Sequence, residues 1–290
     1  MKCTDRVGNE IKQDETQGKV LKFLYQTILG RILLTQLVKP KVTHWAGYVL
    51  NHSISRLLIT PFVKKNKINL TEYEDQKYSS YNDFFTRKRK DSYDKIDCFP
   101  EHLIAPCDGK LSVYPINKEA HFTIKDTPYS MESLVRSKKL AKRYEDGQLL
   151  LFRLTVDDYH RFCYIDCGIK TRNYHIPGFF HTVNPLANDV VPVYKENTRE
   201  FSVLKSENFG NILIMEVGAL LVGKIVNYHE ETTVTRGEEK GRFEFGGSTI
   251  LICLEKNQII VDKDILDNSM NEIETVVKMG EKIGEKYDSI

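Results

Sequence analysis

The chain has 290 residues, of which 41% are hydrophobic and 28% charged, with no low-complexity tract. This composition is that of a globular protein, and it excludes a disordered or fibrous chain. The length suffices for one substantial core, or for one core with a helical appendage.

The formal net charge of +2 conceals an asymmetry along the chain. Residues 1–90 hold 17 Lys and Arg against 8 Asp and Glu, whereas the remaining 200 residues hold 25 against 32. A basic, apolar N-terminal third indicates either an anionic partner, such as a lipid headgroup or a nucleic acid, or an ordinary solvated basic face. The charge alone does not choose between these interpretations.

The first elements expected are two amphipathic helices. Acidic residues precede any apolar run, which is unlike a secretory signal or a transit peptide. Apolar residues then recur at helical spacing over 20–38 and again over 45–63. Neither stretch reaches the ~18 uninterrupted apolar residues of a spanning helix. Trp45 and the lysines that follow residue 63 favour helices lying on a membrane surface, but two helices packed on the core fit the pattern as well.

Residues 64–100 predict a polar connection, and the pattern changes after Pro100. Short runs rich in Val, Ile, Leu, Tyr and Phe are then bounded by Gly, Pro, Asn and Asp, which predicts β-strands. We place these strands at 103–105, 110–115, 149–156, 162–165, 211–217, 219–228, 242–246 and 249–255. We also expect a helix over 130–143 and a helical or loosely ordered tail over 273–285.

Together these elements predict an α+β protein. A helical N-terminal portion with amphipathic membrane-associating helices, residues 1–99, precedes a β-rich barrel or sandwich domain, residues 100–290. The six cysteines form no CxxC pair, and Cys163 and Cys167 have no neighbouring histidine, so we expect no metal site. Free thiols in a reducing compartment are expected, although the even number leaves a disulfide open.

The sequence Gly246-Gly247-Ser248-Thr249 stands between two predicted strands and allows two interpretations. In a tight turn, glycine supplies a positive φ and serine a side-chain hydrogen bond. Alternatively, Ser248 attacks the carbonyl of Gly247 in an N→O acyl shift, because glycine leaves that carbonyl sterically open and its backbone free for a strained approach. These four residues alone favour the turn.

Five further motifs give this stretch a context. Each is weak alone, but six motifs in the same order over about 170 residues resemble the phosphatidylserine decarboxylase family. The motifs are Phe84-Phe85-Thr86-Arg87, Ala105-Pro106-Cys107-Asp108-Gly109-Lys110, Asp158-Tyr159-His160-Arg161, Gly178-Phe179-Phe180-His181-Thr182-Val183-Asn184-Pro185, Glu216-Val217-Gly218-Ala219, and the Lys-Gly-x-Phe-x-Phe-Gly-Gly-Ser-Thr stretch that ends at Thr249.

The resemblance implies two successive reactions. The chain first cleaves itself after Gly247 into chains 1–247 and 248–290, and Ser248 becomes a covalent pyruvoyl group. That group then forms a Schiff base with the amine of phosphatidylserine, and the substrate loses carbon dioxide to give phosphatidylethanolamine. The implied enzyme is a carboxy-lyase of phospholipid biosynthesis that is made as a zymogen.

The resemblance also implies roles for individual residues. Ser248 is the nucleophile and pyruvoyl precursor, Asp108 orients and charge-stabilises a histidine, and His160 is the base or the later general acid. Ordinary roles also fit, because an Asp-Gly pair is commonly a turn and a strand histidine is commonly hydrogen-bonded in the core. Three basic residues are candidates for binding the substrate phosphate or carboxylate: Arg87, Arg161 and Lys240. Surface salt bridges would explain these residues equally well.

One position departs from the family pattern. Much of the family carries a second histidine three residues after the first, assigned to the self-cleavage relay, where this chain has Cys163. A thiol accepts a proton only as thiolate, with an ordinary pKa of about 8.5. Either His160 serves both reactions, or Cys163 substitutes, or processing is slow or absent. We favour the first interpretation.

The partners implied are a phospholipid substrate and a membrane surface, with the protein at the cytoplasmic face of the cell membrane as a homodimer of processed heterodimers. Two alternatives stay open: a pyruvoyl-dependent decarboxylase of a soluble amino acid, and a membrane-surface homologue that no longer matures because of Cys163. A nucleic-acid partner is disfavoured, because no basic-aromatic stripe that would stack bases is present.

Overall fold

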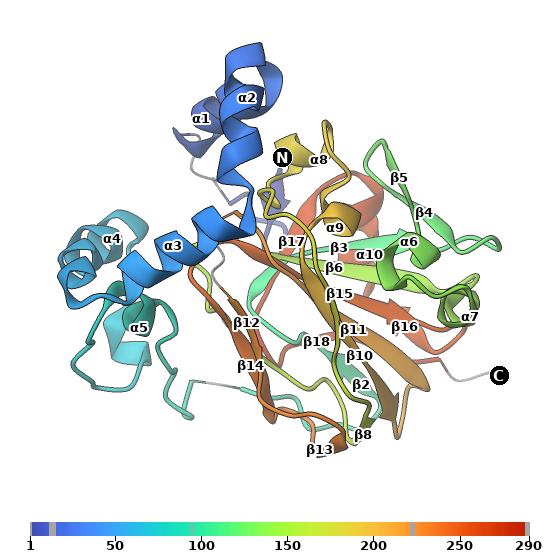
Figure 1. The fold of residues 1–290 in the computed structure, drawn as a ribbon. Coiled ribbons are helices and arrows are strands. Elements are labelled where there is room, and N and C mark those ends of the chain that lie inside the picture. The colour runs from blue at the N-terminus through green and yellow to red at the C-terminus, as the bar shows by residue number, and fades with distance from the viewer. Residues whose placement is uncertain (1, 12–15, 94, 221–223, 288–290) are drawn as a thin grey trace.

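The computed structural model describes residues 2–11, 16–93, 95–220 and 224–287. The N-terminal helices lie along one side of a body made mainly of β-sheet (Figure 1). The α-helices are α1 Thr16–Gln26, α2 Ile28–Leu37, α3 Pro40–Asn51, α4 Ile59–Asn66, α5 Tyr81–Phe85, α6 Met131–Val135, α7 Lys138–Ala141, α8 Pro185–Asn188, α9 Val193–Glu196 and α10 Lys263–Met270. The 3-10 helices are η1 Ser53–Leu58, η2 Leu70–Glu72 and η3 Lys142–Tyr144.

The strands of the described residues form one large sheet and three small ones. They are β1 Cys3–Thr4, β2 His102–Ile104, β3 Gly109–Pro115, β4 His121–Ile124, β5 Thr127–Ser130, β6 Gln148–Leu154, β7 Arg161–Cys163, β8 Gly168–Lys170, β9 Tyr174–Ile176, β10 Arg199–Ser206, β11 Asn211–Val217, β12 Lys224–Asn227, β13 Thr232–Val234, β14 Glu239–Glu244, β15 Ser248–Leu254, β16 Ile259–Val261, β17 Glu274–Val277 and β18 Lys282–Lys286.

The large sheet has the order β1-β17-β3-β6-β15-β11-β10-β8-β13, and β9 pairs with β10. The small sheets are β12-β14-β7, β16-β18-β2 and β4-β5. The sequence predicted a barrel or a sandwich, whereas the large sheet stays open between β1 and β13. The part of the chain that the structure describes is therefore a mixed α/β fold without a closed barrel.

Several sequence predictions about individual elements are wrong. The helices expected over 20–38 and 45–63 are each divided, the first at Thr27 and the second by the 3-10 helix η1. The tail over 273–285, expected to be helical or loosely ordered, forms β17 and β18, which pair with β3 and β2. The β-branched run 275–277 favours this extended conformation. The single helix expected over 130–143 is split, because Arg136 ends α6 in the left-handed region at a φ of 52° and Ser137 then caps α7.

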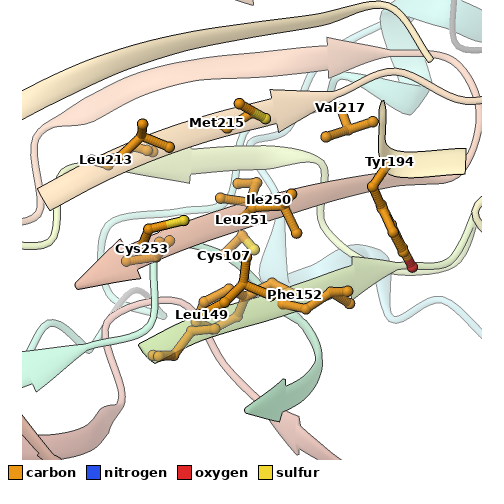
Figure 2. Packing of buried hydrophobic residues seen from close by; sticks show 14 of the residues in the cluster. Cys107, Leu149, Phe152, Tyr194, Leu213, Met215, Val217, Ile250, Leu251 and Cys253 are labelled. Carbon is orange, nitrogen blue, oxygen red and sulfur yellow. The ribbon is translucent and has the colours of Figure 1, made fainter. Parts of the chain in front are cut away.

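Strand β15 lies at the centre of the large sheet, between β6 and β11. All seven of its side chains are buried. In Figure 2, Ile250 and Leu251 of β15 pack among Phe152 of β6 and Val217 of β11. Burying apolar side chains stabilises a fold by roughly 25 cal/mol per Å². The residue that begins β15, Ser248, is consequently fixed by the main core.

The helical hairpin of α1 and α2 contacts the body through a few residues and exposes the others. The hairpin bends at Thr27, which caps α2, and Tyr25 and Leu34 are buried. No helix among the described residues is both long and apolar enough to cross a bilayer. The exposed large apolar side chains of α1–α3 and η1 are Val20, Phe23, Ile28, Leu29, Ile32, Leu33, Trp45, Tyr48, Val49, Ile54, Leu57 and Leu58.

A buried ion pair ties β6 to β17. Arg153 Nε donates to Glu274 Oε1 at 2.7 Å, and the side chains are 4% and 2% exposed. Replacing Glu274 with alanine leaves this guanidinium buried without its carboxylate, so we expect the free energy of unfolding to fall by about 3–5 kcal/mol in chemical denaturation. Replacing both residues, as Arg153→Met with Glu274→Leu, restores a neutral interior and costs less.

The exposed pair between Lys256 and Asp146, whose side chains are 59% and 31% exposed, provides the matched control. Lys256→Ala removes a solvated ion pair and is expected to change the free energy of unfolding by less than about 1 kcal/mol. Equal losses for Glu274→Ala and Lys256→Ala would contradict the assignment.

Candidate functional site

Ser248 occupies an unusual place for a hydroxyl. It begins β15 opposite Leu154 of β6 and is buried. Its Oγ atom has no hydrogen-bond partner among the described residues. A buried polar group left unpaired costs about 1–3 kcal/mol. The fold therefore holds this hydroxyl in the core without a hydrogen bond to any described residue.

The turn before Ser248 is strained. Phe245 has a φ of 26° and Gly246 a φ of 116°, and a positive φ is unfavourable for a phenylalanine. A Cβ atom on Gly247 would lie 3.3 Å from the carbonyl oxygen of Leu154, so a side chain there would press on β6. The bond between Gly247 and Ser248 thus follows two residues of positive φ and starts at a position that favours glycine.

An aromatic cluster anchors this turn. The ring of Phe245 contacts Tyr81 and Phe85 of α5, with centroids 5.3 and 5.5 Å apart. Phe85 also contacts the imidazole of His160, with ring centroids 4.2 Å apart. Phe85 consequently packs against both the strained turn and the candidate base. This contact explains why a motif near residue 85 and one near residue 160 belong to the same site.

His160 is a buried, neutral imidazole with one nitrogen available. Nδ1 lies 2.9 Å from the carbonyl oxygen of Asp158. Because a carbonyl only accepts, this contact assigns the proton to Nδ1 and the lone pair to Nε2. Nε2 has no partner among the described residues. Burial, with a smaller contribution from the nearby Arg87 cation, lowers the pKa of His160 to about 4. The ring is therefore neutral at neutral pH, and the Nε2 lone pair is not engaged by a described residue.

The segment that holds the Asp158 carbonyl is itself fixed. The Asp158 carboxylate accepts hydrogen bonds from the Thr155 amide at 2.7 Å and from its hydroxyl at 2.9 Å, and it pairs with Lys110. Burial alone would raise the pKa of Asp158, but Lys110 outweighs it and holds that pKa below its ordinary value. Asp158 thereby positions the tautomer of His160.

Asp108 is buried and bound by cations. It accepts from Arg89 Nη2 at 2.8 Å, Lys278 Nζ at 3.0 Å and the Met279 amide at 3.0 Å. Burial would raise the pKa of Asp108, but Lys278 and Arg89 outweigh that effect and lower it. Its described hydrogen bonds include none to His160, so the structure does not bring together the pair that the sequence suggested.

Arg161 and Lys240 are already paired with carboxylates. Arg161 donates to Glu239 at 2.7 Å and twice to the carbonyl of Thr86. Lys240 is fully buried and donates to Glu216 at 2.8 Å. Lys240 is therefore no surface residue, and its ion pair joins β14 to β11. Arg87 is different, because its guanidinium is buried and forms no ion pair with a carboxylate among the described residues.

Cys163 lies beside the Asp108 segment. It is buried, and its amide donates to the carbonyl of Pro106 at 2.8 Å. Burial, followed by the neighbouring Asp108 and Cys163, raises the pKa of the Cys107 thiol well above its ordinary value. All six cysteines are free thiols in the structure.

The two remaining motifs frame the start of β15. Val217 of β11 pairs with Thr249, and Asn197 donates to the carbonyls of His181 and Gly218. The Thr182 amide donates to the hydroxyl of Tyr25 at 3.1 Å, so helix α1 contacts the same block. The six motifs are scattered in the sequence, but in the fold they lie around β15 or around the residues that contact it.

Comparison with known proteins gives the same family. A model of the family "Phosphatidylserine decarboxylase" matches residues 81–285. Phosphatidylserine decarboxylase proenzyme 2 of Clostridium acetobutylicum is 45% identical over 269 residues, which cover 92% of each chain. The chain belongs to the phosphatidylserine decarboxylase family. The corresponding proenzyme of Fusobacterium nucleatum is 39% identical over 97% of this chain and 96% of its own. That of Clostridium kluyveri is 41% identical over 99% of each.

The decarboxylase-family site contains residues that sequence reasoning did not single out. Phe245 and Phe85 were quoted within motifs without a role, and their contact with each other is visible only in the fold. Arg89 lies two residues after the motif that ends at Arg87, so its charge offered a weak signal. Lys278 comes from the tail that was not expected to form strands, and no local pattern linked it to Asp108.

The buried His160 makes stability depend on pH. Its pKa is about 4 in the folded chain against an ordinary 6.5, so the unfolded chain binds the proton more readily. The resulting stability is fully present above pH 6.5 and is lost as pH falls toward 4, by about 3 kcal/mol at most. We expect the denaturation midpoint of the Ser248→Ala protein to fall over this range, and to fall less when His160→Gln is added.

The Ser248→Ala background keeps every compared chain intact. His121→Gln in that background is the control, because His121 is exposed. If His160→Gln and His121→Gln proteins showed the same pH dependence as the parent, His160 would not be the buried titrating group.

Proposed function

We propose that this chain decarboxylates phosphatidylserine to phosphatidylethanolamine, using a pyruvoyl group made from Ser248 by self-cleavage after Gly247. The observation that carries the proposal is the buried Ser248 hydroxyl without a hydrogen-bond partner, placed directly after a strained turn. Membership of the family supports the activity, and the relatives are named as proenzymes.

In the proposed cleavage, His160 Nε2 removes the hydroxyl proton of Ser248, and Oγ attacks the carbonyl carbon of Gly247. The peptide C–N bond breaks as its nitrogen takes up the proton, and an ester remains. Loss of the Ser248 Cα proton then expels the Gly247 carboxylate and leaves dehydroalanine. Tautomerisation and addition of water release ammonia and leave the pyruvoyl group at position 248.

The surroundings of Ser248 suit this group. A pyruvoyl group at position 248 would supply an electrophilic carbonyl for the substrate amine and an electron sink for the loss of carbon dioxide. The start of β15 fixes its position, and the cluster of Phe85 and Phe245 excludes water from one side. In this proposal His160 Nε2 first takes up a proton from solvent and then passes it to the substrate carbon after carbon dioxide has left, and Asp158 keeps its ring oriented.

The two product chains are expected to stay together. Residues 248–290 include β15, β17 and β18, each of which pairs with a strand of residues 1–247. The ion pairs between Asp108 and Lys278 and between Arg153 and Glu274 also cross the cut. Cleavage thus changes the backbone only at the start of β15 and leaves its ladder pairs from Thr249 onward intact.

We also propose that the apolar side chains exposed on α1–α3 and η1 lie on the cytoplasmic face of the cell membrane. Contiguous apolar surface exposed to water is unfavourable, and burial in the bilayer interface relieves that cost. The protein is then peripheral, and its N-terminal portion, residues 1–99, brings the catalytic domain, residues 100–290, to its lipid. A homodimer of cleaved chains is the assembly we propose.

The proposal is tested by comparing wild type with Ser248→Ala on a denaturing gel and in a carbon dioxide release assay with phosphatidylserine micelles. We expect wild type to give two chains and to release carbon dioxide. Ser248→Ala should stay at 33.6 kDa and be inactive. An intact wild-type chain would exclude the pyruvoyl route. A cleaved chain that releases carbon dioxide from free serine but not from phosphatidylserine would indicate that the substrate is a soluble amino acid.

The choice of proton acceptor gives a separate prediction. Because His160 Nε2 is available and neutral, we expect His160→Gln to slow cleavage by at least about 100-fold. Cys163→Ala should cleave within about threefold of wild type, because general-base catalysis does not pass through the thiol. Timed gels after expression measure both rates. Slow cleavage in Cys163→Ala together with normal cleavage in His160→Gln would assign the relay to Cys163.

A further inference from the structure

Arg87 is a buried cation of the site that lacks a charged partner among the described residues. Its side chain is 1% exposed, and its guanidinium carbon lies over the rings of Tyr73 and Phe84, at 4.3 and 4.8 Å from their centroids. Cation–π contacts contribute about 0.5–2 kcal/mol each, whereas an unpaired buried ion costs several kcal/mol. The aromatic rings therefore compensate only part of the cost of burying this charge.

The hydrogen bonds of Arg87 leave much of its donor capacity unused. Nη2 donates to the Tyr73 hydroxyl at 3.3 Å and Nη1 to the Phe84 carbonyl at 3.4 Å, both long for a guanidinium. Nε has no partner among the described residues. Because Nε is unpaired and Nη2 makes only one long contact, the Nε and Nη2 edge is the part of the group available to a ligand. This edge matches the two oxygens of a carboxylate or a phosphate.

The other cations considered for substrate binding do not offer such an edge. Arg161 donates to Glu239 and Thr86, and Lys240 is paired with Glu216 inside the protein. Arg87 also acts electrostatically on His160, which places its charge within reach of the proposed reaction centre. An anionic group of the substrate is thus best accommodated at Arg87.

The chemistry of decarboxylation selects between the two anions of the substrate. The α-carboxylate loses its charge as carbon dioxide departs, so an arginine bound to it would stabilise the ground state more than the transition state and slow the step. The phosphodiester keeps its charge throughout. Binding it anchors the headgroup without opposing the reaction.

We infer that Arg87 binds the phosphodiester of the substrate through its Nε and Nη2 edge. The phosphodiester then replaces the long contact between Nη2 and the Tyr73 hydroxyl. This inference rests on the proposed function and names the group of the lipid that the site recognises. The site selects for a phosphodiester next to the serine, not for a long acyl chain.

The test uses two soluble substrates, glycerophosphoserine and O-methylserine, so that membrane contact plays no part. In wild type we expect kcat/KM to favour the phosphodiester by about 10–100-fold, the range of a charge-assisted hydrogen bond. Arg87→Gln should reduce the preference to within about threefold, mainly through KM for glycerophosphoserine. Arg87→Lys, which keeps the charge but not the paired donors, should fall between them.

Lys88→Gln is the matched control, because Lys88 is the next residue and its side chain is 43% exposed. It should keep the full preference. Self-cleavage, followed on a gel, separates failure of the proposed function from failure of the Arg87 inference. A wild-type chain that does not cleave contradicts the proposed function, whereas a variant that cleaves is folded and tests Arg87. An Arg87→Gln protein that cleaves and keeps the preference overturns the inference.

Wild type alone decides the question if the Arg87 variants do not accumulate. Equal kcat/KM for the two soluble substrates overturns the inference, and a preference for the phosphodiester supports it. Inorganic phosphate is added to the O-methylserine reaction as a further probe. Stimulation by free phosphate would show that the site takes the free ion, and we expect none.

Discussion

The structure depends on the burial of β15 at the centre of the large sheet. This strand pairs with β6 on one side and β11 on the other, and its side chains form the middle of the core. Ser248 is its first residue, so the position of one hydroxyl is set by the packing of the whole sheet. The same packing leaves that hydroxyl without a hydrogen bond, a local cost that the surrounding apolar burial offsets.

The other parts of the site are arranged around this fixed strand. Phe245 holds an unfavourable φ because Tyr81 and Phe85 of α5 pack against its ring. Phe85 in turn contacts His160, whose tautomer is set by the Asp158 carbonyl. A single chain of contacts therefore connects the short helix α5 to the strained turn and to the candidate base. In this account, cleavage releases strain at the turn while the strand keeps its place.

The sequence allowed the family, the mixed helix and strand content and eight of the eighteen described strands to be predicted, because ordered motifs and short apolar runs are local signals. It did not allow the tail to be predicted, since β17 and β18 gain their hydrogen bonds from β3 and β2, more than 100 residues away in the chain. For the same reason the cations around Asp108 were missed, because Lys278 reaches it only through that tail. The unused donors of Arg87 are likewise a property of three-dimensional packing that no spacing of residues reveals.

The central claim is that the bond after Gly247 is broken by Ser248, which becomes a pyruvoyl group. Intact-mass spectrometry of the purified protein under denaturing conditions tests it most directly. The account predicts two masses, those of residues 1–247 and 248–290, with the smaller chain lighter by one ammonia than a chain that begins with serine. A single mass of the uncleaved chain, or a small chain with an unmodified N-terminal serine, would contradict it.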